Sequence, residues 1–306
     1  MKSVLSKSSD SAFSVTRHNA PSYLTPEAVS AFIKSALAED IGEGDHTTAA
    51  TVPEVCKTQA QLLVKDRGIL AGVSLARQIY AHVDPAIRMD VLMHDGDEIK
   101  PGDVVFISEG SARALLSTER LILNCMQRMS GVATYTHRLC QLLKGTEAKL
   151  MDTRKTTPNF RLLEKWAVSI GGGVNHRFGL YDKIMIKDNH VDLAGGIRPA
   201  IDRVHLYLKT KEKKLAIEVE TRSLQEVTEA LSVGGIDIIM LDNMGITEMA
   251  QAVKQINGVC KTEASGGIAE KNLRAIADCG VDFISMGALT HTVRSLDLSL
   301  KVISRK

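Results

Sequence analysis

The first half of the chain mixes helical and strand-like patterns of apolar residues. Apolar positions recur on one face of a helix that starts with Thr25, a capping residue, and Pro26, which suits a first helical turn. Short apolar or alternating runs predict three strands, at 60–64, 87–93 and 104–108. A helical pattern then extends over 112–143, with a break near Gly131. These elements predict a small α+β domain that ends in helices.

The second half has a regular rhythm of short apolar runs separated by helical stretches. Six such runs occur, at 149–152, 183–186, 215–219, 236–241, 259–263 and 281–286. Parallel strands need helical crossovers of this kind, and the nearly continuous apolar run at 236–241 is typical of a strand buried on both faces. The pattern predicts six βα units that form a barrel or an open parallel sheet.

Composition and charge remove several classes of protein. The 306 residues carry a formal net charge of +2, which gives no sign of a nucleic-acid or polybasic membrane surface. The five cysteines include no C-x-x-C pair, which argues against a disulfide framework and a zinc site. No apolar run approaches the ~20 residues of a membrane helix, and the serine-rich residues 1–20 lack the apolar core of a secretory signal. We therefore expect a soluble, cytoplasmic protein with a loose tail at 1–20.

Charged residues and glycines follow all six predicted strands. Because ligands bind at the carboxyl ends of strands in parallel α/β folds, these positions are expected to converge. In chain order they are Thr153, Arg154 and Lys155; Lys187; Glu218 and Glu220; Asp242; Ser265, Gly266 and Gly267; and Gly287 with His291, joined by His176 and Arg177 from a glycine-rich loop. Any one of them could be an ordinary loop residue, whereas agreement at six strand ends indicates a site.

The signs of these charges constrain the ligand. The arginines and lysines would repel one another in a cleft unless an anion filled it. The glycine-rich turns at 265–267 and 287 precede helices and suit a phosphate group. Glu220 and Asp242 could hold ribose hydroxyls, Mg²⁺ or a developing cation. Alternatively, Glu220 and still more Glu218 could be structural partners of a lysine or arginine. The residues alone thus indicate an enzyme for a polyanionic, phosphate-bearing substrate.

Eight segments together resemble the quinolinate phosphoribosyltransferase family, also called carboxylating nicotinate-nucleotide pyrophosphorylases. The resemblance runs from about residue 25 to the end of the chain. The segments are EDIG with GD and TT over 39–48, STERLILN at 117–124, DTRKTTP at 152–158, NHR at 175–177, IKDNH at 186–190, LDN at 241–243, EASGGI at 263–268 and GALTH at 287–291.

The resemblance implies an α/β fold with two domains. An N-terminal α/β sandwich at 21–126 is expected to precede an open α/β barrel at 127–306 with about six parallel strands. The last helix of the barrel domain is expected to pack back on the N-terminal domain. The resemblance also implies a homodimer, or a larger oligomer built from dimers, in which each site is shared with the partner's N-terminal domain.

The reaction implied by the resemblance is a decarboxylating phosphoribosyl transfer in de novo NAD biosynthesis. Quinolinate and phosphoribosyl pyrophosphate give nicotinate mononucleotide, pyrophosphate and CO₂, and Mg²⁺ is required. Lys155, Glu220 and Asp242 are expected to be catalytic, with Mg²⁺ carried by phosphoribosyl pyrophosphate near the two carboxylates. The expected substrate-binding residues are Arg120, Thr153, Arg154, His176, Arg177, Lys187, Ser265, Gly266, Gly267, Gly287, Ala288 and His291.

Two alternative functions remain open at this point. One is a nicotinate phosphoribosyltransferase that acts without decarboxylation, although so many cationic residues favour a dicarboxylate. The other is a non-catalytic sensor of a phosphate ligand on the same barrel. Neither alternative predicts a nucleic-acid or membrane partner.

Overall fold

The computed structural model describes residues 21–305 and divides them into two compact units. The first unit holds residues up to Thr134, together with Leu162–Ile170 and the residues from Arg294 onward. The second unit holds Tyr135–Arg161 and Gly171–Val293. The boundary expected at 126/127 therefore falls at 134/135 in the structure, inside one long helix. The predicted tail at 1–20 lies outside the described residues.

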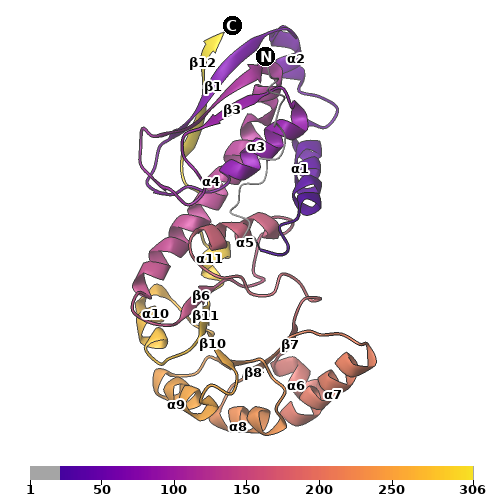
Figure 1. Ribbon diagram of the computed structural model, residues 1–306, viewed down its shortest axis with the longest axis vertical. Helices are drawn as coiled ribbons and strands as arrows, with labels where there is room; N and C mark the ends of the chain where they lie inside the picture. Colours follow the sequence, from indigo (N-terminus) through magenta and orange to yellow (C-terminus); the bar gives the residue numbers. More distant parts are fainter. Residues whose placement is uncertain (1–20, 306) are drawn as a thin grey trace, which may run out of the picture. The chain divides into compact units, whose positions relative to one another are not determined.

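The first unit is built on an antiparallel sheet with strand order β12-β1-β5-β3. Its strands are β1 (Lys57–Val64), β3 (Arg88–Val91), β5 (Val104–Ser111) and β12 (Leu298–Arg305). A small ribbon pairs β2 (Gly68–Ile69) with β4 (Glu98–Ile99). The helices of this part of the chain are α1 (Pro26–Ile41), α2 (His46–Thr51), α3 (Val73–Val83), α4 (Ala112–Leu142) and α5 (Arg161–Ile170) (Figure 1).

Two helices show how closely the local pattern predicted this unit. The Thr25 side chain accepts a hydrogen bond of 3.2 Å from the Ala28 backbone N–H, so α1 begins with the predicted cap. The break predicted near Gly131 is wrong, because α4 runs without interruption through that residue. Gly131 is flanked by the fully buried Met129 and Val132, and such packing outweighs the ~1 kcal/mol that a glycine costs a helix.

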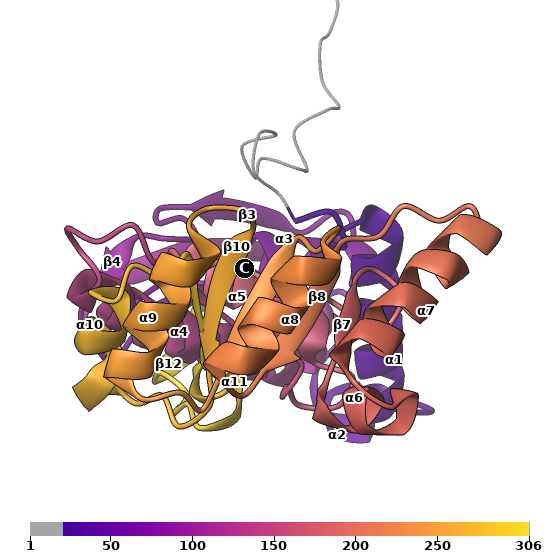
Figure 2. The same ribbon diagram turned by 90° about the horizontal axis from the view of Figure 1, so that it is seen from below.

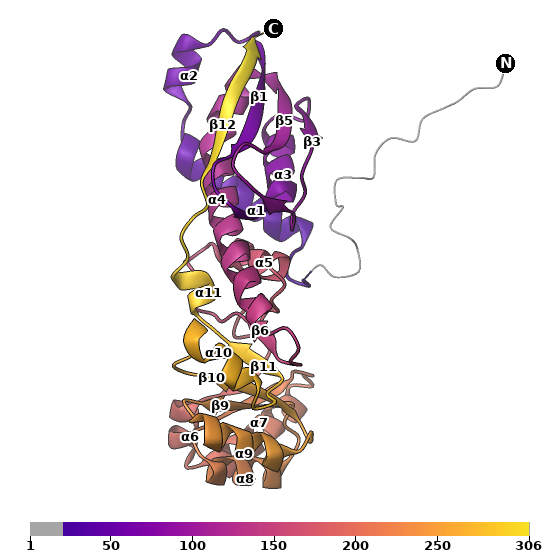
Figure 3. The same cartoon turned by 90° about the vertical axis from the view of Figure 1, so that its left-hand side faces the viewer.

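The C-terminal segment forms a strand that joins the sheet of the first unit. Strand β12 pairs antiparallel with β1 and places Leu298, Leu300 and Val302 opposite Val64, Leu62 and Ala60, which are all buried (Figure 3). Apolar residues that alternate with a period of two point to the same face of a strand, whereas a helix would spread them around its axis. The segment from Arg294 onward that belongs to the first unit therefore contains a strand, whereas the last helix of the chain, Ala288–His291, belongs to the second unit.

The second unit contains the predicted six-stranded parallel sheet, with order β6-β11-β10-β9-β8-β7. The strands are β6 (Lys149–Met151), β7 (Ile184–Ile186), β8 (Ile217–Thr221), β9 (Ile238–Asp242), β10 (Lys261–Ser265) and β11 (Phe283–Ser285). The helices are α6 (Asp188–Ala194), α7 (Ile197–Thr210), α8 (Leu224–Val233), α9 (Ile246–Ile256), α10 (Glu270–Ala277) and α11 (Ala288–His291). Helices α8 and α9 lie on the outer side of the sheet (Figures 1 and 2).

The sheet is open, because β6 and β7 are its two ends in the strand order. An isolated parallel bridge between Met151 and Val174 extends the β6 end. Every residue of β8 is buried, as expected of a parallel strand covered on both faces. The predicted α/β fold with six parallel strands is confirmed. Within residues 21–305, no helix combines the length and the apolar character needed to cross a membrane.

Candidate active site

The predicted site residues of the second unit cluster at one edge of its parallel sheet. All five strand pairings are parallel, so the carboxyl ends of the six strands lie along the same edge. Asp242 and Ser265 are the last residues of β9 and β10 and are paired in register. Lys187 directly follows β7, and Gly287 lies two residues beyond β11. The loop with Thr153, Arg154 and Lys155 starts two residues after β6.

Two carboxylates end neighbouring strands at this edge. Glu220 lies near the end of β8, is 8% exposed, and its Oε2 lies 3.0 Å from Nζ of Lys187. Asp242 is half-buried at the end of β9, where its Oδ2 accepts a hydrogen bond of 2.7 Å from the Asn243 side-chain amide. Two oxygen donors on adjacent strands suit Mg²⁺ that is bound mainly by substrate phosphates and water.

The turn after β10 favours glycine by its backbone conformation at two positions and by lack of space at Gly266. Gly266 has φ +85° and Gly267 has φ +61°, a region that side chains with a Cβ rarely adopt. A Cβ on Gly266 would collide with the side-chain amide of Asn243. The Asn243 backbone N–H also donates to the Ser265 carbonyl oxygen at 2.9 Å. The turns after β9 and β10 are therefore packed closely together.

The turn after β11 is approached by two basic side chains. A Cβ on Gly287 would lie 3.0 Å from Cδ of Lys155 and 3.0 Å from ring atoms of His291. The Thr290 hydroxyl donates to the Lys155 carbonyl oxygen at 2.7 Å, which ties the short helix α11 to the loop after β6. Ala288 is the first residue of α11. Lys155, Gly287 and His291 are thus brought together from loops that follow two neighbouring strands.

Arg154 and Arg177 form a second group of positive charge. The Arg177 guanidinium donates to the Lys183 carbonyl oxygen at 3.2 Å. Partial burial lowers the pKa of Arg177, and the charge of Arg154 lowers it further. The Nε of Arg154 is buried and has no hydrogen-bond partner among the described residues. A buried, unpaired donor beside a second cation favours an anionic ligand.

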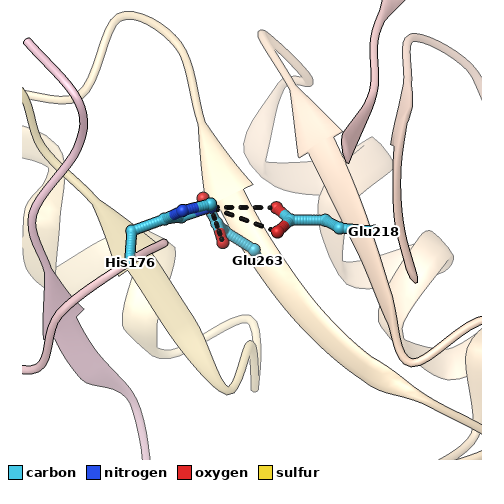
Figure 4. Close-up of side chains that lie close together, drawn as sticks. All are labelled: His176, Glu218 and Glu263. Atoms are coloured by element: carbon cyan, nitrogen blue, oxygen red, sulfur yellow. Dashed lines mark hydrogen bonds and ion pairs between the residues drawn. The ribbon is translucent and has the colours of Figure 1, made fainter. Parts of the chain in front are cut away.

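His176 lies in a buried polar cluster with Glu218 and Glu263 (Figure 4), and the half-buried Lys183 contacts this cluster through Glu218. Its Nδ1 accepts a hydrogen bond of 2.7 Å from the Arg177 backbone N–H. Its Nε2 lies 3.1 Å from Oε2 of Glu218 and 3.5 Å from Oε2 of Glu263. Lys183 Nζ lies 3.1 Å from the same Glu218 oxygen. Both ring nitrogens of His176 are therefore engaged by the protein.

The two glutamates of this cluster have opposite protonation behaviour. Burial favours the neutral acid in both, but the hydrogen bond from His176 and the charge of Lys183 lower the pKa of Glu218 below its usual range. Burial, followed by the nearby charge of Glu218, raises the pKa of Glu263 well above its usual range. The surroundings therefore favour the charged form of Glu218 and the neutral form of Glu263, as expected of two acidic groups that share one buried site.

The geometry of this cluster argues against a metal ion. His176, Glu218 and Glu263 could together offer three ligand atoms that lie within 4.8 Å of one another. A ring nitrogen that accepts from a backbone N–H carries no proton, so the neutral His176 holds its proton on Nε2. That nitrogen then lacks the lone pair that a metal requires. His176 and Lys183 are each hydrogen-bonded to Glu218, whereas the two buried Glu263 oxygens have no hydrogen-bond partner among the described residues. Glu220 and Asp242 stay the predicted pair for Mg²⁺.

Several supporting residues were missed by the sequence analysis. Asp152 is fully buried, and its carboxylate accepts from the backbone N–H of His176 at 2.8 Å and from the Asn175 side-chain amide at 2.6 Å. It therefore holds the loop of His176 and Arg177 at the end of β6. Lys183 and Glu263 were missed in the same way. Asp152 and Glu263 both lie in segments that carry the family resemblance, DTRKTTP and EASGGI, and this position could have marked them as site residues.

Arg120 belongs to the other unit. It lies on α4 with an exposed side chain. The part of the segment STERLILN that contains it is thus presented at the surface of the helix. Its predicted role at a shared site stays a prediction.

Comparisons with known proteins agree with this geometry. The family model described as the N-terminal domain of quinolinate phosphoribosyl transferase matches residues 45–130, and the model for the C-terminal domain matches residues 132–301. A chloroplastic nicotinate-nucleotide pyrophosphorylase [carboxylating] from Arabidopsis thaliana is 45% identical over 297 residues, which cover 92% of this chain and 84% of the relative. A probable enzyme of the same name from Bacillus subtilis is 42% identical, over 86% of this chain and 90% of its own.

The solved structures lead to the same family. The crystal structure of NadC from Streptococcus pyogenes has a TM-score of 0.85 and 38% identity, and the match covers 92% of this chain and 99% of that one. Both domains, in the same order, are therefore shared with these relatives. The chain belongs to the quinolinate phosphoribosyltransferase family.

Proposed function

We propose that this chain transfers the phosphoribosyl group of phosphoribosyl pyrophosphate to quinolinate and releases CO₂. The quinolinate nitrogen forms a bond to C1 of the ribose while the bond to pyrophosphate breaks. The ring nitrogen becomes cationic and accepts the electron pair when the neighbouring carboxylate leaves as CO₂, and a proton then replaces that carboxylate. The product is nicotinate mononucleotide. This makes the protein a pentosyltransferase that contributes to NAD biosynthesis.

The arginine pair carries this proposal. Arg154 and Arg177 lie in loops at the edge where β6, β9, β10 and β11 end, and the buried Nε of Arg154 lacks a partner among the described residues. Guanidinium groups match carboxylates through two parallel hydrogen bonds, and quinolinate has two adjacent carboxylates. His176 supports this pair through its hydrogen bond with the Arg177 backbone.

The phosphoribosyl donor is assigned to the glycine turns and the lysines. Lys155 reaches the turn at Gly287 together with His291, and the turn at Ser265–Gly267 offers backbone N–H groups with positive φ. Thr153, Lys187 and Ala288 belong to the same edge. Holding both substrates in place at one sheet edge supplies up to ~7–11 kcal/mol of the barrier reduction.

Glu220 and Asp242 are assigned to the ribose side of the reaction. Breaking the bond to pyrophosphate leaves positive charge on the ribose, and a nearby carboxylate stabilises it. Mg²⁺ bound to the pyrophosphate would neutralise charge on the leaving group. The nearly buried Glu220 is aimed at Lys187, whereas the fully buried Glu218 is occupied by His176 and Lys183. This difference favours Glu220 over Glu218 as the site carboxylate.

The assembly and the cellular location are part of the same proposal. We infer a homodimer, or an oligomer of dimers, in which Arg120 of one protomer completes the quinolinate site of its partner. A cytoplasmic location also stays a prediction, since the Arabidopsis relative is named chloroplastic. Fractionation of cells that express the full chain would decide the location.

The function is tested by incubating the protein with quinolinate, phosphoribosyl pyrophosphate and Mg²⁺ and detecting products by mass. We expect nicotinate mononucleotide, pyrophosphate and CO₂ in equal amounts. Turnover of nicotinate without CO₂ release would support a non-decarboxylating transferase instead. Binding of both substrates with no pyrophosphate formed would support a sensor.

A further inference from the structure

Arg161, the first residue of α5, connects the two loops that carry the arginine pair. Its Nε donates to Oγ1 of Thr156 at 2.9 Å, and its two terminal nitrogens donate to the carbonyl oxygens of Phe178 at 3.0 Å and Arg154 at 3.3 Å. Thr156 and Arg154 lie in the loop after β6, and Phe178 directly follows Arg177. All four of these residues belong to the second unit.

The partners of Arg161 are all neutral. Among the described residues, no carboxylate lies within ion-pair distance of its guanidinium. Three of its five N–H donors are used on one hydroxyl and two backbone carbonyls. Its side chain is half-buried. A guanidinium used in this way bridges separate segments of backbone in one fixed geometry.

Such a bridge matters because the two substrate arginines repel each other. The charge of Arg154 lowers the pKa of Arg177, so the two cations interact before any anion is bound. Without a connection between the loops, this repulsion would favour their separation. A connection made in advance reduces the ordering that quinolinate binding must otherwise provide.

We propose that Arg161 is a positioning residue that holds the loops of Arg154 and Arg177 at the spacing required by quinolinate. This inference rests on the proposed function and adds to it a residue that touches the protein and not the substrate. The hydrogen bond to the Arg154 carbonyl sets the backbone of one arginine. The hydrogen bond to Phe178 sets the backbone next to the other.

The test compares steady-state kinetics of wild type, Arg161→Ala, Arg161→Lys and Arg198→Ala. Arg198 is a matched control, because it lies near the start of α7 and donates to Ser232 at 2.8 Å far along the chain from both loops. We expect Arg161→Ala to raise the KM for quinolinate at least tenfold and to leave the KM for phosphoribosyl pyrophosphate within threefold. Added guanidinium ion at low millimolar concentration should restore part of the loss. Arg198→Ala should behave as wild type.

The quinolinate KM of Arg161→Lys, compared with those of wild type and Arg161→Ala, adds a second test. Lysine keeps the charge but cannot reach three acceptors at once, so its KM should be intermediate. A quinolinate KM within twofold of wild type in Arg161→Ala would overturn the proposal. A loss of kcat by the same factor, with both KM values unchanged, would also overturn the proposal, because the positioning of one substrate cannot produce that result.

Two further measurements keep the outcome decisive. If Arg161→Ala fails to fold, Thr156→Val and Arg161→Lys replace it, and an unchanged quinolinate KM in both overturns the proposal. If the wild type makes no mononucleotide, the proposed function fails. Calorimetric binding of benzene-1,2-dicarboxylate to wild type and to the Arg161 variants then tests the positioning role by itself. Equal affinity for this diacid in wild type and variants would overturn it.

Discussion

The Nε2 atom of His176 lies 3.1 Å from Oε2 of Glu218, and both side chains are buried. The opposite ring nitrogen accepts from the Arg177 backbone N–H. This arrangement connects the fully buried β8 to the loop of a substrate arginine. His176 thus anchors the loop of Arg177 to the sheet. Both of its ring nitrogens are hydrogen-bonded to other groups of the protein.

Lys183 and Glu218 should show a large coupling energy in a double-mutant cycle on the free energy of unfolding. Lys183→Met leaves the buried Glu218 carboxylate without its cation and should lower the free energy of unfolding by about 3 kcal/mol. Glu218→Gln alone should also destabilise the protein, but the double variant should be more stable than the sum of the two losses predicts. Urea unfolding measures all four proteins. Losses that add without coupling would contradict the ion pair.

An exposed ion pair provides the control for this cycle. Lys261 Nζ lies 2.6 Å from Asp282, but the lysine side chain is 64% exposed. Lys261→Met should therefore cause a much smaller loss than Lys183→Met, because water already solvates the charge that remains.

The free energy of unfolding of Glu263→Gln, relative to that of the wild type, should increase as the pH rises. The folded pKa of Glu263 is raised above the unfolded value of ~4.3, so its contribution to stability is complete below that pH and is lost as the pH rises toward the folded pKa. Glutamine copies the neutral acid and does not titrate. The difference in unfolding free energy between variant and wild type should therefore increase from pH ~5 to pH ~7. The lowered pKa of Glu218 places its own titration below this window.

Denaturant unfolding at several pH values measures this difference. A constant difference across the window would contradict the raised pKa of Glu263. Both an ordinary and a lowered folded pKa would place the titration of Glu263 below pH ~5 and leave the difference unchanged.

Arg154→Ala and Arg177→Ala should each raise the KM for quinolinate at least tenfold, which corresponds to about 1.4 kcal/mol. The physical reason is the loss of paired hydrogen bonds to one carboxylate. Initial rates at saturating phosphoribosyl pyrophosphate measure the effect, and Arg203→Ala on the exposed side of α7 is the control. Unchanged quinolinate saturation in both variants would rule out this arginine pair as the dicarboxylate site.

Gly266→Ala should impair both stability and activity. The φ of +85° costs a residue with a Cβ ~1–2 kcal/mol, and the new Cβ would collide with Asn243 beside Asp242. Gly245→Ala is the matched control, because Gly245 has φ −66° and no atom within 4 Å of a new Cβ. Thermal unfolding and kcat measure both variants. Equal behaviour of the two alanine variants would show that the turn at Gly266 adapts freely.

A mixed dimer should reveal whether Arg120 serves the partner's site. Arg120→Ala and Arg154→Ala should each be nearly inactive alone with quinolinate at low concentration. Mixed after reversible dissociation, they form heterodimers in which one of the two composite sites contains both arginines, so activity should return to at most half of wild type. No recovery in a preparation shown by mass to contain heterodimers would contradict a shared site.

The sequence predicted the strands of the second unit well but placed several of them early. The run at 215–219 corresponds to β8 at Ile217–Thr221, and the run at 259–263 corresponds to β10 at Lys261–Ser265. Apolar character alone marks the interior of a strand, whereas hydrogen bonding to neighbouring strands decides where it ends. The shift places Glu220, which follows the predicted run, inside β8, while Glu218 lies deeper in the same strand.

The sequence by itself determined the order of elements, the parallel sheet and the residues that end its strands, because periodicity and turn residues are local properties. It also carried the resemblance that named the reaction. Only the tertiary structure decided that the C-terminal segment forms β12. It also decided that Asp152 and Arg161 hold the site loops. The cluster of His176, Glu218 and Glu263, with Lys183 beside it, likewise appears only in the folded chain. These contacts join residues that lie far apart along the chain, and their charges and protons depend on burial and on neighbours that no local pattern contains.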